Sequence, residues 1–375
     1  MNQARPAPPE GNDEFQRALS RAFMRGQWQN EASRQSGQAG VEEATKGVFG
    51  PKPSGQPYLW PWPLVRGFLD QSCEAVPKSF TSRRSLLFNN PGLAKGTTAT
   101  INIGVQLIKP GELAWAHRHS IGALRFVIEG NPSLHTVVNG ETCAMEPHDL
   151  VLTPAWTWHD HHNAGAGEGI WLDVLDGPLV NALNQTFFET YGEDQQPLAS
   201  AAGDGVAMLA APENVLPPPG RGARMRFPWR EVEPRLLAAA RGPGSPYDGV
   251  VLEYVDPETG GPALPSLACW AQMLRPGEKT KSHRHTSSAV YHVIRGNGRT
   301  VVGDTVLEWG PKDCFAIPNW AWHEHRNLSE TSDAALFSVN DVPLVRFLGL
   351  YREEPEVSIS REIVARGDGG FLRRP

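Results

Sequence analysis

The chain has 375 residues, which is enough for two domains of ordinary size with full cores. Its net charge of −6, with 20% charged residues, provides no basic excess to hold a phosphate backbone, so nucleic-acid binding is not expected. No apolar run approaches the roughly 20 residues that span a bilayer, no signal peptide is evident, and the four cysteines have no paired spacing, so we expect a cytoplasmic protein with reduced thiols.

The first part of the chain, residues 1–57, is an arm rich in Gly, Gln, Glu and Pro. Apolar residues at helical spacing predict one amphipathic helix over about residues 14–25. The arm either lacks fixed structure or packs on a neighbouring subunit, and both alternatives are open. The compact body begins near Tyr58, and residues 83–88 are predicted to form a strand that ends at Asn89-Asn90-Pro91-Gly92.

A β unit is predicted over about residues 98–178, because short runs of Val, Ile, Leu and Thr alternate with turn residues such as Asn139-Gly140. This unit contains His117-Arg118-His119, and His159 follows on a later strand. Since successive side chains of a strand point to opposite faces, His117 and His119 project the same way. A third imidazole on a returning strand can complete three nitrogen ligands around one metal.

The chain after this unit alternates between helix, linker and strand character. Residues 179–191 are predicted to be a helix, and the Pro-, Gly- and Ala-rich stretch that follows is a linker. Within that linker a helix is expected over residues 231–241. Residues 248–254 return to strand character, and the tail after Phe347 is expected to be short strand and loop.

A second β unit, over about residues 266–342, repeats the first. His283-Arg284-His285 and then His323 stand in the same order as the first set, and all twelve histidines fall within residues 117–162 or 283–325. The chain therefore contains two copies of one small unit, each with a His-x-His…His set. Closely spaced turn signals favour antiparallel barrels or sandwiches over alternating β and α layers.

These motifs resemble the cupin superfamily in its two-domain, bicupin form, and more closely the group of gentisate, salicylate and 1-hydroxy-2-naphthoate dioxygenases. The cupin motifs are carried by Gly111, His117, His119, Gly130, Asp149 to Pro154, His159 and Asn163. The likeness to the dioxygenases is carried by Ala123 to Phe126, Trp156 to His161, Glu253-Tyr254 and Thr259 to Gly261. Two departures are His148 and Trp156, which stand where general cupin motifs have glycines.

The resemblance covers roughly residues 58–350 and implies an all-β fold. It predicts two antiparallel β-barrel (jelly-roll) domains with a few peripheral helices and the N-terminal arm. It further implies a homotetramer, in which the arm would contact a neighbouring subunit. The expected boundaries are 1–57 for the arm, 58–192 for the catalytic N-terminal cupin domain, 193–246 for the linker and 247–375 for the C-terminal cupin domain.

Three neutral imidazoles would leave a divalent ion its full charge and adjacent open positions. Imidazole suits Fe, Zn, Cu or Ni, so the ligand type does not name the metal. The resemblance implies Fe(II), and cleavage of an aromatic hydroxy acid by O₂ between its carboxyl- and hydroxyl-bearing carbons. Gentisate, converted to maleylpyruvate, is the first expectation. Salicylate, halo-, amino- or nitro-substituted salicylates and 1-hydroxy-2-naphthoate are the alternatives.

Two other classes of function fit the same residues. A non-oxygenase metal enzyme, such as an isomerase or decarboxylase, would turn over without O₂. A small-acid binding bicupin would bind gentisate without loss of its aromatic absorbance.

A substrate carboxylate inside the barrel needs a cationic partner. Arg125, six residues past His119, has the strand parity of the ligands and can face inward, where a guanidinium suits a carboxylate. Arg83 and Arg84 are candidates for a second contact. Strand alternation lets only one of these two face the pocket, and the sequence does not say which.

Three further residues are candidates for the substrate pocket. His161, two past His159, is expected on the same face and can exchange a proton with a ring hydroxyl. Gln106 is a candidate for holding the carboxylate or hydroxyl. The resemblance implies that Gln, Arg, His and Asp positions line the pocket, which adds Asp173, either to orient His161 or in a purely structural role.

The C-terminal unit has residues that match the three metal ligands, but it lacks the arginine and the aspartate expected in the substrate pocket. Tyr291 stands at the position of Arg125, and Phe337 at that of Asp173. We therefore expect a mainly structural role for this unit, with a second catalytic site as the alternative. The residues that match are His283, His285 and His323, a candidate second metal site, together with Gln272 and His325.

Overall fold

The computed structural model describes residues 17–18, 21–24, 51–76, 83–198, 225–256 and 260–356. The chain divides into a unit of residues Met1–Pro51 and a unit of residues Lys52–Pro375. Of the helix expected over residues 14–25, Arg17, Ala18 and Arg21 are helical, and the amide of Ala22 donates to the Ala18 carbonyl at 3.1 Å. The ends of that helix lie outside the described residues.

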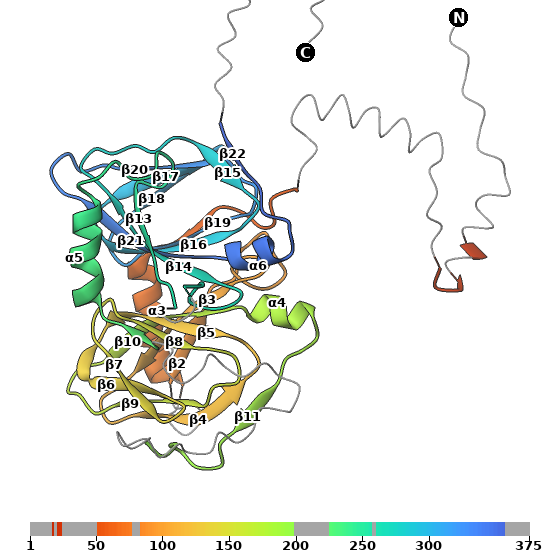
Figure 1. Cartoon of the computed structure of the whole chain (residues 1–375). Helices are drawn as coiled ribbons and strands as arrows, with labels where there is room; N and C mark the ends of the chain where they lie inside the picture. The colour runs from red at the N-terminus through yellow and green to blue at the C-terminus, as the bar shows by residue number, and fades with distance from the viewer. Residues whose placement is uncertain are drawn as a thin grey trace, which may run out of the picture. The chain divides into compact units, whose positions relative to one another are not determined.

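The larger unit is all-β, as predicted, and consists of two jelly-roll barrels, each made of one six-stranded and one five-stranded antiparallel sheet (Figure 1). In the N-terminal barrel the sheet orders are β12-β8-β5-β10-β3-β2 and β11-β4-β9-β6-β7. Its strands are β2 (Arg84–Leu87), β3 (Asn102–Ile108), β4 (Leu113–His119), β5 (Ala123–Glu129), β6 (Asn131–Val138), β7 (Glu141–Met145), β8 (Leu150–Thr153), β9 (His159–Asn163), β10 (Gly169–Leu175), β11 (Phe188–Thr190) and β12 (Arg226–Phe227).

The C-terminal barrel repeats this plan, with sheet orders β1-β19-β16-β21-β14-β13 and β18-β17-β20-β15-β22. Its strands are β1 (Tyr58–Trp60), β13 (Val250–Glu253), β14 (Ala268–Leu274), β15 (His283–His285), β16 (Ala289–Arg295), β17 (Gly298–Val302), β18 (Thr305–Trp309), β19 (Cys314–Ile317), β20 (His323–Asn327), β21 (Ala334–Asn340) and β22 (Glu353–Pro355). The order of strands confirms that the sequence repeat is a structural repeat.

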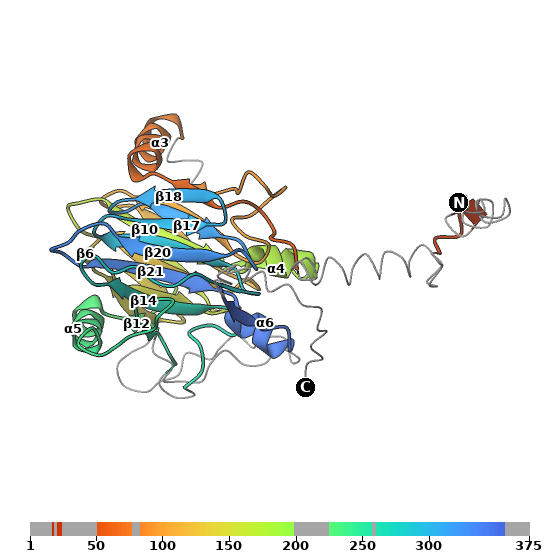
Figure 2. The same ribbon diagram turned by 90° about the horizontal axis from the view of Figure 1, so that it is seen from above.

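Within the described residues of the larger unit, four helices lie around the barrels: α3 (Trp62–Ala75), α4 (Gly177–Ala182), α5 (Trp229–Ala239) and α6 (Val342–Phe347). Figure 2 shows α3 and α5 on opposite sides of the stacked sheets. The helix expected over residues 231–241 is confirmed by α5, which buries Trp229 and Leu236. None of the helices in the described part of the chain is long and apolar enough to cross a bilayer.

One short strand crosses from the start of the body to the C-terminal barrel, and another extends the N-terminal barrel into the expected linker. β1 precedes the N-terminal barrel in sequence but pairs with β19, and β12, which lies in the expected linker, pairs with β8. The two barrels also share one hydrophobic core, in which the rings of Phe126 and Phe337 stack with centroids 4.1 Å apart. The expected domain boundaries remain a prediction, because the pairing of β1 and the shared core join the barrels into one compact unit.

The prediction of a helix over residues 179–191 is correct only for its first turn and wrong for the rest. α4 ends at Ala182, Asn184 follows with a φ of 56°, and residues 188–190 form β11, which pairs with β4. The left-handed conformation of Asn184 cannot continue a right-handed helix. The partner of β11 lies about seventy residues earlier in the chain, so the local apolar pattern could not reveal it.

The two departures from the glycines of the cupin motifs both lie in left-handed backbone. His148 has a φ of 67° and Trp156 a φ of 66°. The corresponding residues of the second barrel, Lys312 (70°) and Trp320 (59°), repeat the conformation. The left-handed backbone explains why general cupin motifs have glycine at these turns. In this chain larger residues adopt the same conformation at some cost in strain.

Thiol reagents are expected to modify at most Cys73 in the native protein. Cys143, Cys269 and Cys314 are buried, and burial raises the pKa of the Cys143 thiol to about 12 and those of the other two further. Because the thiolate is the reactive form, these three should be inert at pH 8. Counting reacted thiols with a chromogenic disulfide before and after unfolding in guanidinium tests this. Two or more fast thiols in the native state would contradict the structure.

Candidate metal centre

Three imidazoles meet on the inner face of the N-terminal barrel. His117 on β4 lies directly opposite His159 on β9, and a register shift between Ala114 and His117 sets this pairing. The ring centroid of His159 lies 4.4 Å from that of His117 and 4.9 Å from that of His119. Each residue offers a ring nitrogen, and the three nitrogens lie within 4.8 Å of one another. The structure thus brings together the set that the sequence predicted.

Each of these rings is held through its Nδ1 atom by a main-chain carbonyl. With the proton on Nδ1, the Nε2 lone pair is left for a metal, which is the usual arrangement of a ligating histidine. In agreement, the Nε2 atom of His159 is buried without a hydrogen-bond partner. The acceptors are the carbonyl oxygens of Trp115 for His117 (2.7 Å), Ile121 for His119 (2.7 Å) and Thr157 for His159 (3.0 Å).

The electrostatics of the site keep the imidazoles neutral. Burial, and next the positive charge of Arg83, lower the pKa of His117 to about 3, and burial lowers the pKa of His119 to about 4. The pKa of His159 is held well below its usual value by burial and by Arg125. All three are therefore unprotonated near pH 7 and can act as ligands for a divalent ion.

Arg125 faces the inside of the barrel, as strand parity predicted, and is only 2% exposed. Its Nε atom lies 3.6 Å from Oδ1 of Asp173, which is directly opposite on β10, and its guanidinium also donates to the hydroxyl of Thr153. Gln106 donates to the other oxygen of Asp173 at 2.6 Å. Burial lowers the pKa of Arg125 to about 10, with Asp173 opposing, so it stays charged at neutral pH.

The structure separates Arg83 from Arg84. Arg84 forms a buried ion pair with Glu112, away from the imidazoles. Arg83 lies just before β2, where its charge contributes to the lowered pKa of His117 and His161. Burial lowers the pKa of Arg83 itself, with the Asp173 carboxylate opposing. Of the two candidates, Arg83 is the one beside the imidazoles.

Replacing Arg84 with Met is expected to lower the free energy of unfolding by about 3–5 kcal/mol, because Glu112 would be left as an unpaired buried charge. Metal content per chain should not change, since the pair lies away from the imidazoles. Chemical denaturation and metal analysis measure both. The double variant Arg84→Met/Glu112→Gln should regain much of the stability, and a loss of metal in either variant would contradict this placement.

His161 is buried on the same face as His159, with ring centroids 6.0 Å apart. Its Nδ1 atom lies 2.7 Å from the hydroxyl of Thr136, and that hydroxyl donates to the sulfur of Met145. The expectation that Asp173 orients His161 is therefore wrong, because Asp173 is engaged by Arg125 and Gln106 while Thr136 holds the ring. The Nε2 atom of His161 is buried without a partner.

Four residues of this site were not predicted. Thr136 and Thr153 hold His161 and Arg125, and the indole of Trp171 lies 5.1 Å from the His161 ring. Trp171 stands two residues before Asp173 on β10, so strand alternation could have found it. Phe188 on β11 stacks on the ring of His117 with centroids 5.1 Å apart. It was missed because its segment was expected to be helical.

The C-terminal barrel contains a second group of three imidazoles whose ring nitrogens also lie within 4.8 Å of one another. Its surroundings differ in charge from those of the first group. The ring of His325 approaches the hydroxyl of Thr300 at 2.9 Å, as His161 does with Thr136. The three imidazoles belong to His283, His285 and His323.

The expectation that Phe337 replaces Asp173 is wrong by one residue. Tyr291 does stand at the position of Arg125, but Tyr291 pairs with Ser338, as Arg125 pairs with Asp173. The loop before β21 is one residue longer than the loop before β10, so spacing counted along the chain slips at this point. In the second barrel a tyrosine and a serine therefore stand at the positions of Arg125 and Asp173.

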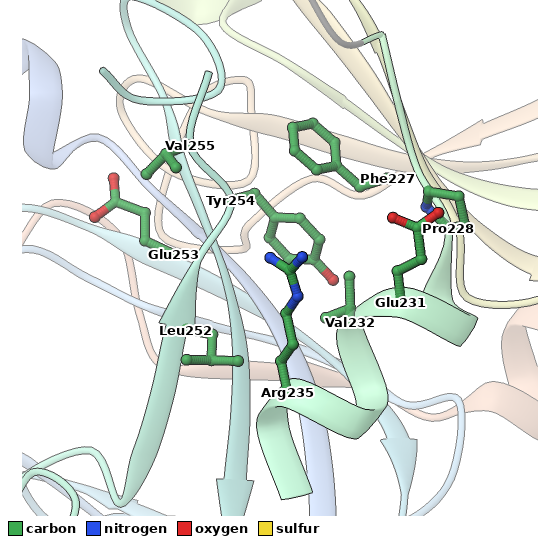
Figure 3. A pocket seen from close by; sticks show the side chains of 9 residues that line it. All are labelled: Phe227, Pro228, Glu231, Val232, Arg235, Leu252, Glu253, Tyr254 and Val255. Atoms are coloured by element: carbon green, nitrogen blue, oxygen red, sulfur yellow. The ribbon is translucent and has the colours of Figure 1, made fainter. Parts of the chain in front are cut away.

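A separate hollow of about 260 Å³ lies between α5 and the segment around β13. In Figure 3, Val232 and Arg235 extend from α5, while Leu252 and Tyr254 lie on the other side. Its described lining includes no histidine, so it is distinct from both imidazole groups.

Two jelly-roll barrels with a His-x-His…His set inside each define the class of bicupins. In keeping with this, residues 104–175 and 270–340 match the family described as the cupin domain. Over 96% of this chain and 93% of its own length, 1-hydroxy-2-naphthoate 1,2-dioxygenase of Nocardioides sp. (strain KP7) is 39% identical to it. The chain belongs to the bicupin family of gentisate, salicylate and 1-hydroxy-2-naphthoate 1,2-dioxygenases, and it is therefore a ring-cleaving dioxygenase.

Other relatives and solved structures agree. The 5-aminosalicylate 1,2-dioxygenase of Comamonas sp. is 45% identical over 81% of this chain and 83% of that protein. Gentisate 1,2-dioxygenase 1 of Aquipseudomonas alcaligenes is 36% identical over 81% and 88%. The crystal structure of salicylate 1,2-dioxygenase from Pseudaminobacter salicylatoxidans aligns with a TM-score of 0.75 and 26% identity, covering 94% of this chain and 99% of that one. That enzyme has also been solved with gentisate.

Proposed function

We propose that His117, His119 and His159 hold Fe(II) and that the enzyme inserts both atoms of O₂ between the carboxyl- and hydroxyl-bearing carbons of a salicylate-type acid, with gentisate converted to maleylpyruvate as the first candidate. The observation that carries this proposal is the convergence of three neutral imidazoles beside a buried guanidinium. When bound, the ion would supply coordination positions for the substrate and O₂ and a path for electrons from the ring to O₂.

The charges around the imidazoles favour an anionic substrate. Arg125 and Arg83 contribute two buried positive charges, and Asp173 contributes one negative charge. A substrate carboxylate would be attracted to these positive charges, and a guanidinium binds a carboxylate with charge-assisted hydrogen bonds. Asp173, held by Gln106, fixes the position of Arg125 before the substrate arrives.

His161 is suited to accept a hydrogen bond from the substrate's ring hydroxyl. Because the Thr136 hydroxyl donates to the Met145 sulfur, its oxygen accepts from the Nδ1–H of His161. The unpartnered Nε2 atom then has a free lone pair. Burial and the nearby Arg125 keep the pKa of His161 well below its usual value, so this lone pair is available at neutral pH.

A 5-substituted salicylate is the second candidate substrate, supported by the 45% identity to 5-aminosalicylate 1,2-dioxygenase. 1-Hydroxy-2-naphthoate is a third, supported by the relative that matches along almost the whole chain. All of these share a carboxylate ortho to a hydroxyl. Ring-fission absorbance with the Fe(II)-loaded enzyme in air, ranked by kcat/KM over this panel and salicylate, identifies the substrate. Consumption of none of these acids would refute the proposal.

We also propose a cytoplasmic homotetramer. The four cysteines lie free in the fold, which suits a reducing compartment. Light scattering of the full chain after size-exclusion chromatography should give four times the chain mass of 41.0 kDa. A monomer or dimer would refute the assembly while leaving the chemistry unaffected.

A further inference from the structure

A carboxylate stands near the start of β13 in the C-terminal barrel, whereas a guanidinium stands near the start of β2 in the N-terminal barrel. Gln106 and Gln272 occupy corresponding positions in the two barrels. Gln106 on β3 pairs with a residue of β2, and Gln272 on β14 pairs with a residue of β13. Arg83 directly precedes β2, whereas Asp248 lies two residues before β13. The same edge of the fold therefore presents opposite charges to the two groups of imidazoles.

Asp248 is held so that one of its oxygens points toward the second group of imidazoles. Its Oδ1 atom lies 3.8 Å from Nε2 of His283, while Oδ2 accepts from the hydroxyl of Ser245 at 2.9 Å. Gln272 donates to the main-chain carbonyl of Asp248 at 2.7 Å, which fixes the turn. Two ligands of a four-coordinate ion with bonds of about 2.0–2.2 Å are separated by about 3.4 Å. The distance to His283 is close to that of two ligands of one metal, and the Asp248 carboxylate would complete the set by moving toward the three imidazoles, whose nitrogens lie within 4.8 Å of one another without it.

The imidazoles themselves are oriented for ligation. The Nε2 atoms of His283 and His323 are buried without hydrogen-bond partners. The opposite nitrogens are engaged, by the Glu353 carboxylate for His283 and by the carbonyl of Ala321 for His323. A carboxylate behind a ligating histidine is a familiar support of metal sites. His285 is held in the same way by the Ser287 carbonyl at 2.8 Å.

The space beside these groups is too small for a substrate. The cavity that Asp248, His283 and His285 line, together with Tyr291, has a volume of about 40 Å³. Pockets for small organic ligands usually measure about 300–1,000 Å³. This cavity has room for an ion and a water or two, but not for an aromatic acid.

We propose that the C-terminal barrel binds a divalent metal ion in a closed site made of His283, His285, His323 and the carboxylate of Asp248. Asp248 supplies from within the chain the anionic ligand that the N-terminal centre takes from its substrate. A closed set of four protein ligands is typical of structural rather than catalytic sites. The ion ties the turn of residues 245–249 to the barrel and takes no part in ring cleavage.

The test uses the full-length chain with His159→Ala, which removes the N-terminal centre, stripped with a chelator and reloaded with Zn²⁺. We expect one zinc per chain by elemental analysis, none after the further change His323→Ala, and a zinc Kd at least about tenfold weaker after Asp248→Asn. The matched control is Tyr247→Phe in the same turn, whose ring stacks on His283, and it should bind zinc like its parent. Failure of the His159→Ala chain to bind zinc, or an unchanged Kd in Asp248→Asn, would overturn the proposal.

A cobalt spectrum tests whether the site is closed. Co²⁺ in the His159→Ala chain should give the visible absorption of a four-coordinate ion, and gentisate or azide should leave it unchanged. A change in that spectrum on adding either molecule would show an open site and overturn the proposal. If His159→Ala does not fold, the same counts are made in the otherwise unaltered chain, where His323→Ala should lower the metal content from two ions to one. These readouts do not depend on turnover, so they remain decisive even if the proposed dioxygenase substrates fail.

Discussion

His159→Ala is expected to abolish ring cleavage and to release the metal of the N-terminal barrel in the same step. The imidazole of His159 is 1% exposed and lies opposite His117. At such a buried position, solvent cannot readily supply a replacement ligand for the metal. Loss of an ion that supplies several kcal/mol of transition-state stabilisation should lower kcat at least about a thousandfold. Elemental analysis and ring-fission absorbance on the same preparation measure both effects.

The control for this variant is His162→Ala, on the same strand but pointing to the other face, where its ring contacts His135. It should keep both metal and activity. His159→Gln, which preserves most of the side-chain volume, separates loss of a ligand from a packing defect. Normal turnover of a His159 variant that has lost its N-terminal metal would contradict the assignment of this centre.

Arg125→Met is expected to leave the metal bound but to raise KM for the hydroxy acid. A hydrogen bond between charged groups contributes about 1.5–3 kcal/mol, which corresponds to a loss of roughly 10- to 150-fold in kcat/KM. The same change removes the Arg125 charge beside the Asp173 carboxylate, which is only 4% exposed. The free energy of unfolding should therefore fall by about 3–5 kcal/mol.

The double variant Arg125→Met/Asp173→Asn separates these two effects. It removes the buried carboxylate while Gln106 can still donate to the new amide oxygen, so stability should largely return. The raised KM should remain, because the substrate carboxylate still lacks its guanidinium. Recovery of KM together with stability would show that Arg125 acts only through folding.

The ligand set was predictable because it depends on local spacing. His117 and His119 are two residues apart on one strand, and the same pattern recurs in the second barrel, so alternation alone places both imidazoles on one face. Arg125 was predictable for the same reason. The all-β fold followed from the repeat and its turn residues, and the resemblance to bicupins added the jelly-roll form of the two barrels.

What could not be predicted depends on partners that are distant in sequence. The choice between Arg83 and Arg84 is made by the pairing of β2 with β3 and by the buried carboxylate of Glu112. Ser338 was hidden by one extra residue in the loop before its strand. Asp248 belongs to a turn, where no alternation says which way a side chain points.

Oxygen uptake measured together with the loss of aromatic absorbance tests most directly whether this site cleaves hydroxy acids with O₂. With the Fe(II)-loaded enzyme and its preferred acid, one O₂ should be consumed for each ring opened, and turnover should stop in anaerobic buffer. Equal turnover without O₂, or binding of every acid in the panel without any loss of aromatic absorbance, would contradict the proposed chemistry.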